Sequence, residues 1–210
     1  EVFVDPDKRA RAVTTIERNA SALAHIVNDV LDVSRIISGK IHLQRERVNL
    51  ADLVRYAVDA VMPAAIEKNL QISASYDGEH AYVEGDIARL QQVLWNIASN
   101  AVKFTDPGGR IDVALVCRDR EAEITVADTG IGMPPEFLPR AFDRFSQHEA
   151  GPTRERGGLG LGLSISRDLV ELHGGRNRAD VGLPRTLRQR DLIGRHRGPG
   201  VLRDRGVVRT

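Results

Sequence analysis

Apolar and polar positions follow a helical period over the first part of the chain. From Arg11 to Ile37 the seam positions recur in steps of four and three residues, and charged residues fill the other faces. This is the pattern of a helix that packs against other helices in a bundle or coiled coil. The seam positions are Ile16, Ala20, Leu23, Val27, Val30, Ser34 and Ile37. We therefore expect one long amphipathic helix that ends at Ser38-Gly39.

The period then changes, and short extended stretches separate helical ones. Alternation of apolar and polar residues predicts extended chain over 41–48 and strands at 70–76 and 82–83. Asn49 is the expected N-cap of the helix between the first two of these stretches. Pro63 lies inside that helical pattern and predicts a kink or an early stop.

The second half of the chain mixes helices, paired strands and Gly-rich loops. The expected elements are a helix capped by Asp86 and running to about Val102, strands at Arg110–Arg118 and Glu121–Asp128 joined by a tight turn, a short helix near 138–145, and a helix over 162–172. Residues 129–162 outside the short helix are rich in Gly and Pro and predict loops.

The composition changes after Gly175. Residues 176–210 hold ten Arg and three Asp, a charge of +7, so the rest of this +1 chain carries −6. The tail has no aromatic residue and only weak alternation, so we expect it to lack closing strands and to be disordered or frameshifted. Arginines without aromatics or a fold are only an electrostatic hint of nucleic-acid binding, and we expect no nucleic-acid partner.

Length, hydrophobic content and cysteine count restrict the classes of protein to which this chain can belong. A chain of 210 residues, 41% of them hydrophobic, is long enough for one compact domain with an appendage. A single cysteine excludes an internal disulfide and fits a reducing compartment. No apolar run reaches the roughly 18–20 residues that span a bilayer, so we expect no membrane contact by this segment. Because the chain begins with Glu1 rather than Met, we interpret it as a piece of a longer protein or as an incompletely recorded sequence.

The predicted helix over 86–102 carries a narrow polar stripe, which continues just past its end. At 100° per residue, Asn96, Asn100 and Lys103 fall within about 60° of each other. A solvated face is the simpler interpretation, but Asn has a low helix propensity. An Asn amide oxygen is a ligand for Mg²⁺, which usually binds with phosphates, and a lysine one turn away would pair with those phosphates.

The stretch "DTGIGM" directly follows a predicted strand. Asp128 lies at the strand end, where its carboxylate can accept a hydrogen bond from a ligand. Gly130 and Gly132 allow close backbone approach and positive φ. By itself this pattern is weak, since a simple turn would show it too.

The stretch "GGLGLGLSISRDL" brings a Gly-rich loop into a helix. Such a junction points backbone N–H groups and the helix dipole at one spot and predicts an anion site, although a flexible linker is the alternative. It is neither a Walker A loop nor a Rossmann turn, because no GK[ST] follows and no strand immediately precedes it. Before it, Phe142 and Phe145 flank Asp143-Arg144 as expected local core, and residues 146–156 have the composition of a lid.

Together these motifs resemble the catalytic domain of sensor histidine kinases, within the GHKL superfamily that also holds gyrase-type ATPases. "LQQVLWNIASNAVKFT" resembles the N box, "DTGIGM" the G1 box, "FDRF" the F box and "GGLGLGL" the G2 box. The resemblance covers about residues 11–175. It implies an α+β fold, a two-layer α/β sandwich with ATP under a lid, preceded by a long helix of a dimerisation bundle.

The resemblance also implies roles for the matching residues. Asn100 is similar to the Mg²⁺ ligand, Asn96 to a partner on the phosphate side, and Lys103 to a phosphate contact. Asp128 would accept from the adenine amino group. The other residues of the expected ATP site are Gly130 and Gly132 in the adenine pocket, Gly158, Gly160, Gly162 and Leu163 at the lid hinge and phosphate cradle, and Arg144 as a lid or interdomain contact.

The N-terminal helix resembles the second helix of the dimerisation and phosphotransfer hairpin, whose first helix carries the phosphoacceptor histidine. None of the six histidines here matches that residue. We therefore expect residues 1–47 to be a partial hairpin with its linker, 48–175 the ATP-binding domain and 176–210 an atypical tail. The implied partners are ATP, Mg²⁺, a second copy of the chain and the receiver domain of a response regulator, in the cytoplasm.

Two alternatives remain open. One is a degenerate, non-catalytic fragment that only dimerises. The other is a stand-alone GHKL ATPase of gyrase type, which requires a glutamate as the water-activating base where this chain has Asn96.

Overall fold

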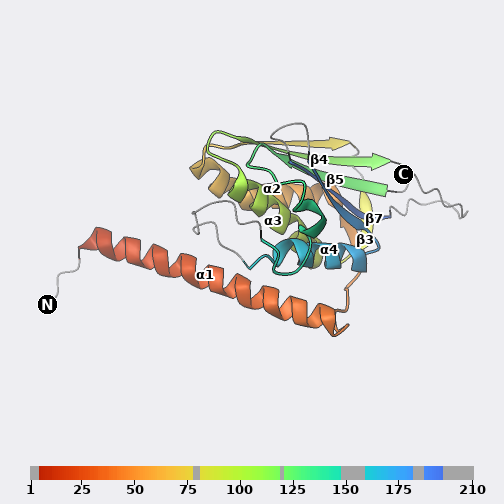
Figure 1. The fold of residues 1–210 in the computed structure, drawn as a ribbon, viewed down its shortest axis with the longest axis horizontal. Coiled ribbons are helices and arrows are strands. Elements are labelled where there is room, and N and C mark those ends of the chain that lie inside the picture. Colours follow the sequence, from red (N-terminus) through yellow and green to blue (C-terminus); the bar gives the residue numbers. More distant parts are fainter. Residues whose placement is uncertain (1–4, 78–80, 119–120, 148–158, 182–186, 196–210) are drawn as a thin grey trace, which may run out of the picture.

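The chain folds into a mixed sheet with helices packed on one of its faces (Figure 1). The computed structural model describes residues 5–77, 81–118, 121–147, 159–181 and 187–195. The helices α2 (Leu50–Glu67), α3 (Ile87–Phe104) and α4 (Gly162–Leu172) form the second layer, and the long helix α1 (Pro6–Ile37) lies on the side of that layer away from the sheet. The predicted two-layer α/β sandwich with a preceding long helix is confirmed.

The elements follow one another in this order: α1 (Pro6–Ile37), β1 (Glu46–Asn49), α2 (Leu50–Glu67), β2 (Gln71–Asp77), β3 (Tyr82–Gly85), α3 (Ile87–Phe104), β4 (Arg110–Arg118), β5 (Glu121–Asp128), the 3₁₀ turn η1 (Leu138–Arg140), α4 (Gly162–Leu172), β6 (Arg176–Val181) and β7 (Leu187–Arg195).

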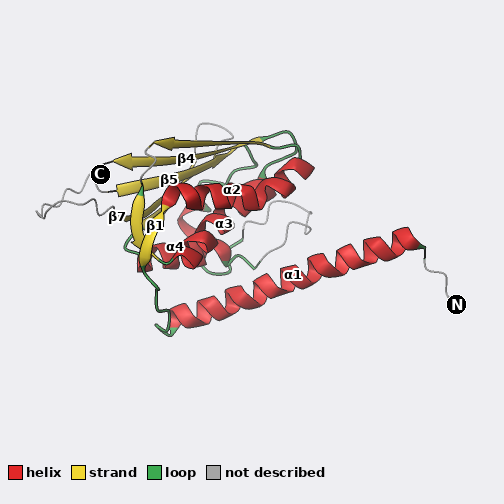
Figure 2. Ribbon diagram, turned by 180° about the vertical axis from the view of Figure 1, so that it is seen from behind, coloured by secondary structure: helices red, strands yellow, loops and turns green. Residues whose placement is uncertain are grey.

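The five-stranded sheet has the order β2-β4-β5-β7-β6. β2 runs parallel to β4, with Gln71 opposite Arg110, and every other neighbouring pair is antiparallel. β1 and β3 form a separate antiparallel ribbon, which Figure 2 shows at one end of the helices. The parallel pair is possible because the β3–α3 segment carries the chain back between β2 and β4.

The core lies between the sheet and the three helices. Alternate residues of β4 and β5 are buried there, as the period of two requires for a sheet covered on one face. The apolar face of α3 packs onto them. These buried residues are Ile111, Val113, Leu115, Ala122, Ile124 and Val126 of the strands, and Leu90, Val93, Leu94, Ile97 and Ala101 of the helix.

The helix α2 begins as the sequence predicts and ends later. The Asn49 side chain accepts a hydrogen bond from the Ala51 N–H at 3.0 Å and caps the helix. Pro63 does not end the helix, which continues to Glu67, so the early-stop alternative was wrong. Val61 and Ala65 on either side of the proline are buried in the core, and this packing opposes the break.

The tail contributes strands, contrary to our prediction. β6 and β7 complete the sheet, and β7 lies between β5 and β6. Strand pairing is made by backbone groups, so it tolerates a sequence whose side chains alternate only weakly. The fit is imperfect, because both polar atoms of the buried Asn177 amide lack a hydrogen-bond partner among the described residues. The frameshift hypothesis is not tested by this pairing, and 182–186 and 196–210 lie outside the described residues.

Other elements differ in extent from their prediction. The helix expected near 138–145 is only the short turn η1, and within 41–48 only the last residues form a strand. The turns expected at 76–78 and 119–120 lie partly or wholly outside the described residues. Among the helices that the structure describes, none combines the length and apolar character needed to cross a membrane.

Candidate nucleotide-binding site

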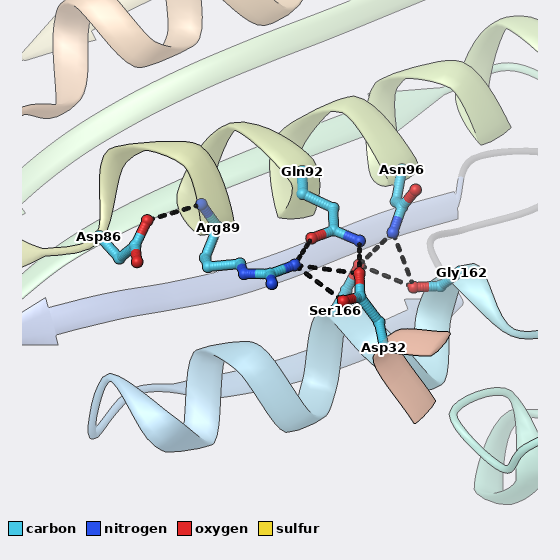
Figure 3. Close-up of polar contacts among 7 residues, drawn as sticks. All are labelled: Asp32, Asp86, Arg89, Gln92, Asn96, Gly162 and Ser166. Carbon is cyan, nitrogen blue, oxygen red and sulfur yellow. Dashed lines mark hydrogen bonds and ion pairs between the residues drawn. The ribbon is translucent and has the colours of Figure 1, made fainter. Parts of the chain in front are cut away.

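The helix α3 presents a line of polar side chains toward α1 and α4. It begins at Asp86, whose carboxylate accepts a hydrogen bond from the Arg89 N–H at 3.1 Å. Gln92 and Asn96 follow at spacings of three and four residues, which places them on one side of a helix. Figure 3 shows the Arg89, Gln92 and Asn96 side chains on the side of α3 that faces α4 and Asp32 of α1.

Asn96 joins α3 to the first turn of α4. It is 6% exposed, so the simpler interpretation of a solvated residue was wrong for this position. Its amide nitrogen donates to the Gly162 carbonyl at 3.1 Å and to the Ser166 hydroxyl at 3.4 Å (Figure 3). The Ser166 hydroxyl donates to the same Gly162 carbonyl at 2.8 Å. The N box and the G2 box, 66 residues apart in sequence, therefore meet at this bond.

Asn100 and Lys103 continue the stripe toward the end of α3, and both are half-buried. The Lys103 ammonium lies 4.9 Å from the centre of the Phe104 ring. Burial lowers the pKa of Lys103 from its ordinary value of 10.5. A desolvated ammonium is stabilised by an anion placed beside it, so this environment suits a phosphate contact.

Asp128 is the last residue of β5 and is partly buried. Burial raises the pKa of its carboxyl above the ordinary value of 3.8, while a hydrogen bond from the Gly130 N–H, 2.8 Å from Oδ1, lowers it. A carboxylate has about four acceptor positions, so this single bond leaves the group able to accept from a ligand.

The loop after β5 lies against the end of α3. The Ile131 N–H donates to the Phe104 carbonyl at 3.3 Å. A Cβ on Gly130 would lie 2.5 Å from that carbonyl oxygen and 2.7 Å from Asp128 Oδ1, so only glycine fits. Gly132 has a φ of +71°, which favours glycine for a different reason. Asp128 is thereby held next to the turn of α3 that carries Lys103.

The Gly-rich segment enters α4 as predicted. Gly160 has a φ of +70°, and a Cβ there would lie 2.6 Å from the Ser146 carbonyl oxygen. Leu161 is buried and anchors the segment, while Leu163 in the first turn of α4 is half-buried. No side chain among the described residues caps the N-terminus of α4, and such an end is suited to an anion. Gly158 lies outside the described residues.

Arg144 ties the segment before the expected lid to α4. Its guanidinium forms an ion pair with Asp168 at 2.9 Å, and its Nε is buried without a hydrogen-bond partner among the described residues. The expected role of Arg144 as a lid contact stays a prediction. The neighbouring Phe145 is 65% exposed with a φ of +60°, so its interpretation as local core was wrong, whereas Phe142 is half-buried.

A polar network between α1 and α3 was not predicted from the sequence. Asp32 is 5% exposed and accepts two hydrogen bonds from Arg89 Nη1, each at 3.0 Å, and one from Gln92 Nε2 at 2.7 Å (Figure 3). Nearby, the His25 and Trp95 rings stack with their centres 4.7 Å apart. We name these five side chains the α1–α3 latch. Sequence gives no signal for it, because charged residues on an amphipathic helix ordinarily face solvent.

His173 is a second residue whose place the sequence did not indicate. Its Nε2 accepts from the Asp86 N–H at 3.0 Å, and its Nδ1 lies 2.7 Å from the Leu169 carbonyl oxygen. This pattern fits a neutral ring with the proton on Nδ1. Burial lowers the pKa of His173 from 6.5, with smaller opposing and reinforcing contributions from neighbouring groups. The ring fastens the end of α4 to the start of α3.

The residues present fit a nucleotide better than a metal ion bound by protein alone. In the described part of the chain, no three His, Cys, Asp or Glu side chains are grouped so as to hold a metal. The gathered groups are instead an acceptor carboxylate, an ammonium, an Asn amide and an open helix N-terminus. A cavity of about 360 Å³ between the β1–β3 ribbon and the starts of α2 and α3 contains none of them.

Comparison with known proteins identifies the family. The family of histidine kinase-, DNA gyrase B- and HSP90-like ATPases matches residues 85–196, more than half of the chain, and the chain belongs to this family. BarA of Escherichia coli K12, a signal transduction histidine-protein kinase, is 37% identical over 169 residues, 78% of this chain and 18% of BarA. This chain spans between 12% and 23% of the length of such curated relatives. It carries an ATP-binding domain of the sensor histidine kinase type.

Two solved structures show the same architecture. Full-length ShkA in complex with AMPPNP is 28% identical, with a TM-score of 0.78 over 94% of this chain and 41% of ShkA. The histidine kinase ThkA, solved in complex with the response regulator protein TrrA, is 24% identical, with a TM-score of 0.68 over 91% of this chain and 52% of ThkA, a likeness of fold. The family match also includes β6 and β7, in agreement with their place in the sheet.

Proposed function

We propose that this chain is the nucleotide-holding part of a protein histidine kinase, which positions Mg-ATP for phosphoryl transfer to a histidine that this chain does not itself contain. Asn100 would hold Mg²⁺ together with the phosphates. Lys103 and the N-terminus of α4 would neutralise phosphate charge, and Asp128 would accept from the adenine amino group. The nucleotide supplies the phosphoryl group.

The observation that carries this proposal is the convergence of three separate motifs on one helix. The loop of Asp128 and Gly130 abuts the end of α3, which also carries Asn100 and Lys103. Asn96 of the same helix is bonded to Gly162 at the start of α4. Catalysis of phosphoryl transfer is mostly positioning and charge neutralisation, and this arrangement offers both.

Asn96 favours transfer over hydrolysis. An amide does not take a proton from water, and the Asn96 amide nitrogen is already committed to the Gly162 carbonyl. This position would need a carboxylate in a gyrase-type ATPase. The gyrase-type alternative therefore predicts phosphate release that this site is not equipped to catalyse.

The partners of the kinase part are also proposals. The seam of α1 remains exposed in the single chain, with Ile16 66%, Leu23 61% and Ile37 65% accessible. We propose that it packs against a second copy in a four-helix bundle. A response regulator receiver domain is the proposed partner that takes the phosphoryl group from that histidine, by analogy with ThkA bound to TrrA. A cytoplasmic location follows from this role.

The test is calorimetric titration of the purified chain with ATP, with and without Mg²⁺. We expect saturable binding that strengthens with Mg²⁺, a loss of binding in Asp128→Ala, and a loss of the Mg²⁺ effect in Asn100→Ala. Asp59→Ala, on the exposed side of α2, is the matched control. GTP lacks the adenine amino group and should bind poorly.

The remaining outcomes distinguish the alternatives. A folded wild-type chain that binds no ATP would leave only the dimerising fragment. Steady phosphate release in the absence of an acceptor helix would instead support the stand-alone ATPase.

A further inference from the structure

The side chain of Lys68, the C-cap of α2, lies at the C-terminal end of α3. The last four carbonyls of a helix lack partners within the helix and carry its negative dipole end. The Lys68 ammonium donates to three carbonyl oxygens there, those of Val102 at 2.7 Å, Thr105 at 2.8 Å and Lys103 at 3.1 Å. One side chain from another helix thus caps this helix end.

The backbone of Lys68 makes a further connection at the same place. Lys68 is the C-cap of α2, with its N–H bonded to the Ala64 carbonyl at 3.2 Å. Its own carbonyl accepts from the Gly108 N–H at 3.2 Å. This single residue therefore joins the end of α2, the end of α3 and the loop that leads into β4.

The Phe104 carbonyl lies against the loop after β5. Phe104 lies between Lys103 and Thr105, whose carbonyls both bind the ammonium. The Phe104 carbonyl points instead to the loop after β5, where it accepts from Ile131 and lies against Gly130. The Lys103 and Thr105 carbonyls belong to the peptide groups on either side of the one that carries the Phe104 carbonyl, so fixing these two restricts the direction of the carbonyl between them.

We propose that Lys68 is a positioning residue for nucleotide binding, acting through the Phe104 carbonyl on the loop that carries Gly130 and follows Asp128. This inference rests on the proposed function, since it assigns a purpose to the loop. Loss of the ammonium would leave three carbonyls to find other partners and would let the last turn of α3 unwind locally. The loop would then lose its support while the core beneath it stays packed.

Calorimetric titration of the full chain with ATP and Mg²⁺ separates this role from a general contribution to stability. The stoichiometry reports the folded fraction, and the dissociation constant reports the pocket of the folded molecules. We expect Lys68→Met to weaken binding about tenfold, the equivalent of about 1.4 kcal/mol, at unchanged stoichiometry. Lys68→Arg, which keeps the charge and the donors, should recover most of the affinity.

Lys40→Met is the matched control, because it removes an exposed lysine outside the site. Amide hydrogen exchange supplies an independent readout. The Ile131 amide should exchange faster in Lys68→Met and at the wild-type rate in Lys40→Met. An unchanged dissociation constant in Lys68→Met, with only a lower melting temperature, would overturn the inference.

The outcomes remain distinguishable from failure of the proposed function. If the wild type binds ATP and Lys68→Met binds it equally well, only the role of Lys68 falls. If the folded wild type does not bind ATP, the proposed function falls and the Lys68 inference falls with it. Should Lys68→Met not fold, Lys68→Gln replaces it: its side chain is shorter, uncharged and has only two N–H donors for the three carbonyls, so wild-type affinity in that variant would overturn the inference.

Discussion

Replacing Asp32 with alanine should release α1 from the ATP-binding domain. Asp32 is the acceptor at the centre of the α1–α3 latch, with three hydrogen bonds from Arg89 and Gln92. Among the α1 side chains that the structure describes, only this residue and Val33 are buried. The contact therefore depends on a small number of interactions, and removal of the acceptor should shift the docking equilibrium.

The size of the effect follows from the exposure of the two partners. Removing one member of a fully buried ion pair costs about 3–5 kcal/mol, because the other charge is left without a partner. The Asp32 side chain is 7% exposed but that of Arg89 is 25% exposed, so water and Gln92 would compensate the guanidinium in part. We expect a loss of about 2 kcal/mol, which is roughly a thirtyfold shift toward the undocked helix.

The chain provides its own reporter for this experiment. Trp95 is the single tryptophan of the sequence, and it stacks on His25 of α1 in the docked state. Undocking should expose the indole and move its emission to longer wavelength. Amide exchange in α1 should rise in the same variant, while exchange in β4 and β5 should stay slow.

Glu17→Ala is the control, since Glu17 is exposed on the same helix. A double-mutant cycle with Arg89→Ala would isolate the pair energy. Trp95 emission and α1 exchange that are identical in Asp32→Ala and wild type would refute the reasoning, because they would show that α1 is held by something other than the latch.

Three further substitutions test other parts of the structure. Gly130→Ala should weaken ATP binding strongly and destabilise the domain by about 1–3 kcal/mol, because the methyl group would overlap the Phe104 carbonyl; titration and thermal unfolding would measure both effects. The pKa of His173 is lowered in the folded state, so the unfolded chain takes up the proton first as the pH falls. The contribution of His173 to stability should be constant above about pH 6.5 and should decrease below it, by up to about 1.4 kcal/mol per pH unit; denaturant titrations should show that His173→Gln lacks this contribution. Asn177→Val should raise the free energy of unfolding by about 1 kcal/mol, since it removes two buried polar atoms without partners among the described residues; an unchanged or lower melting temperature would contradict this.

Local signals in the sequence predicted most element boundaries. The strands Arg110–Arg118 and Glu121–Asp128 and the helix Gly162–Leu172 agree with the structure at both ends. These segments are bounded by Gly, Pro or a charged turn, and their alternation or helical period is regular. The caps at Asn49 and Asp86 were predicted for the same reason, because a side-chain cap is a contact within a few residues.

Contacts between distant segments could not be predicted. The roles of Lys68 and His173 depend on which helix ends meet in space, and no local pattern records that. For the tail, the sequence predicted too little structure. Its alternation is weak, yet β7 pairs with β5 through backbone groups. The resemblance to a family identified the candidate site residues but did not indicate that Asn96 also bonds to Gly162.

The order of the strands has a consequence for synthesis of the chain. β5 is completed at Asp128, but its neighbour on one side, β7, begins only at Leu187. At about 5–20 residues per second, a ribosome needs roughly 3–12 s to make the intervening segment. Throughout that interval β5 presents an unpaired edge that another nascent chain could extend. Slow translation between these strands should therefore lower the yield of soluble protein, even though the finished sheet is unaffected.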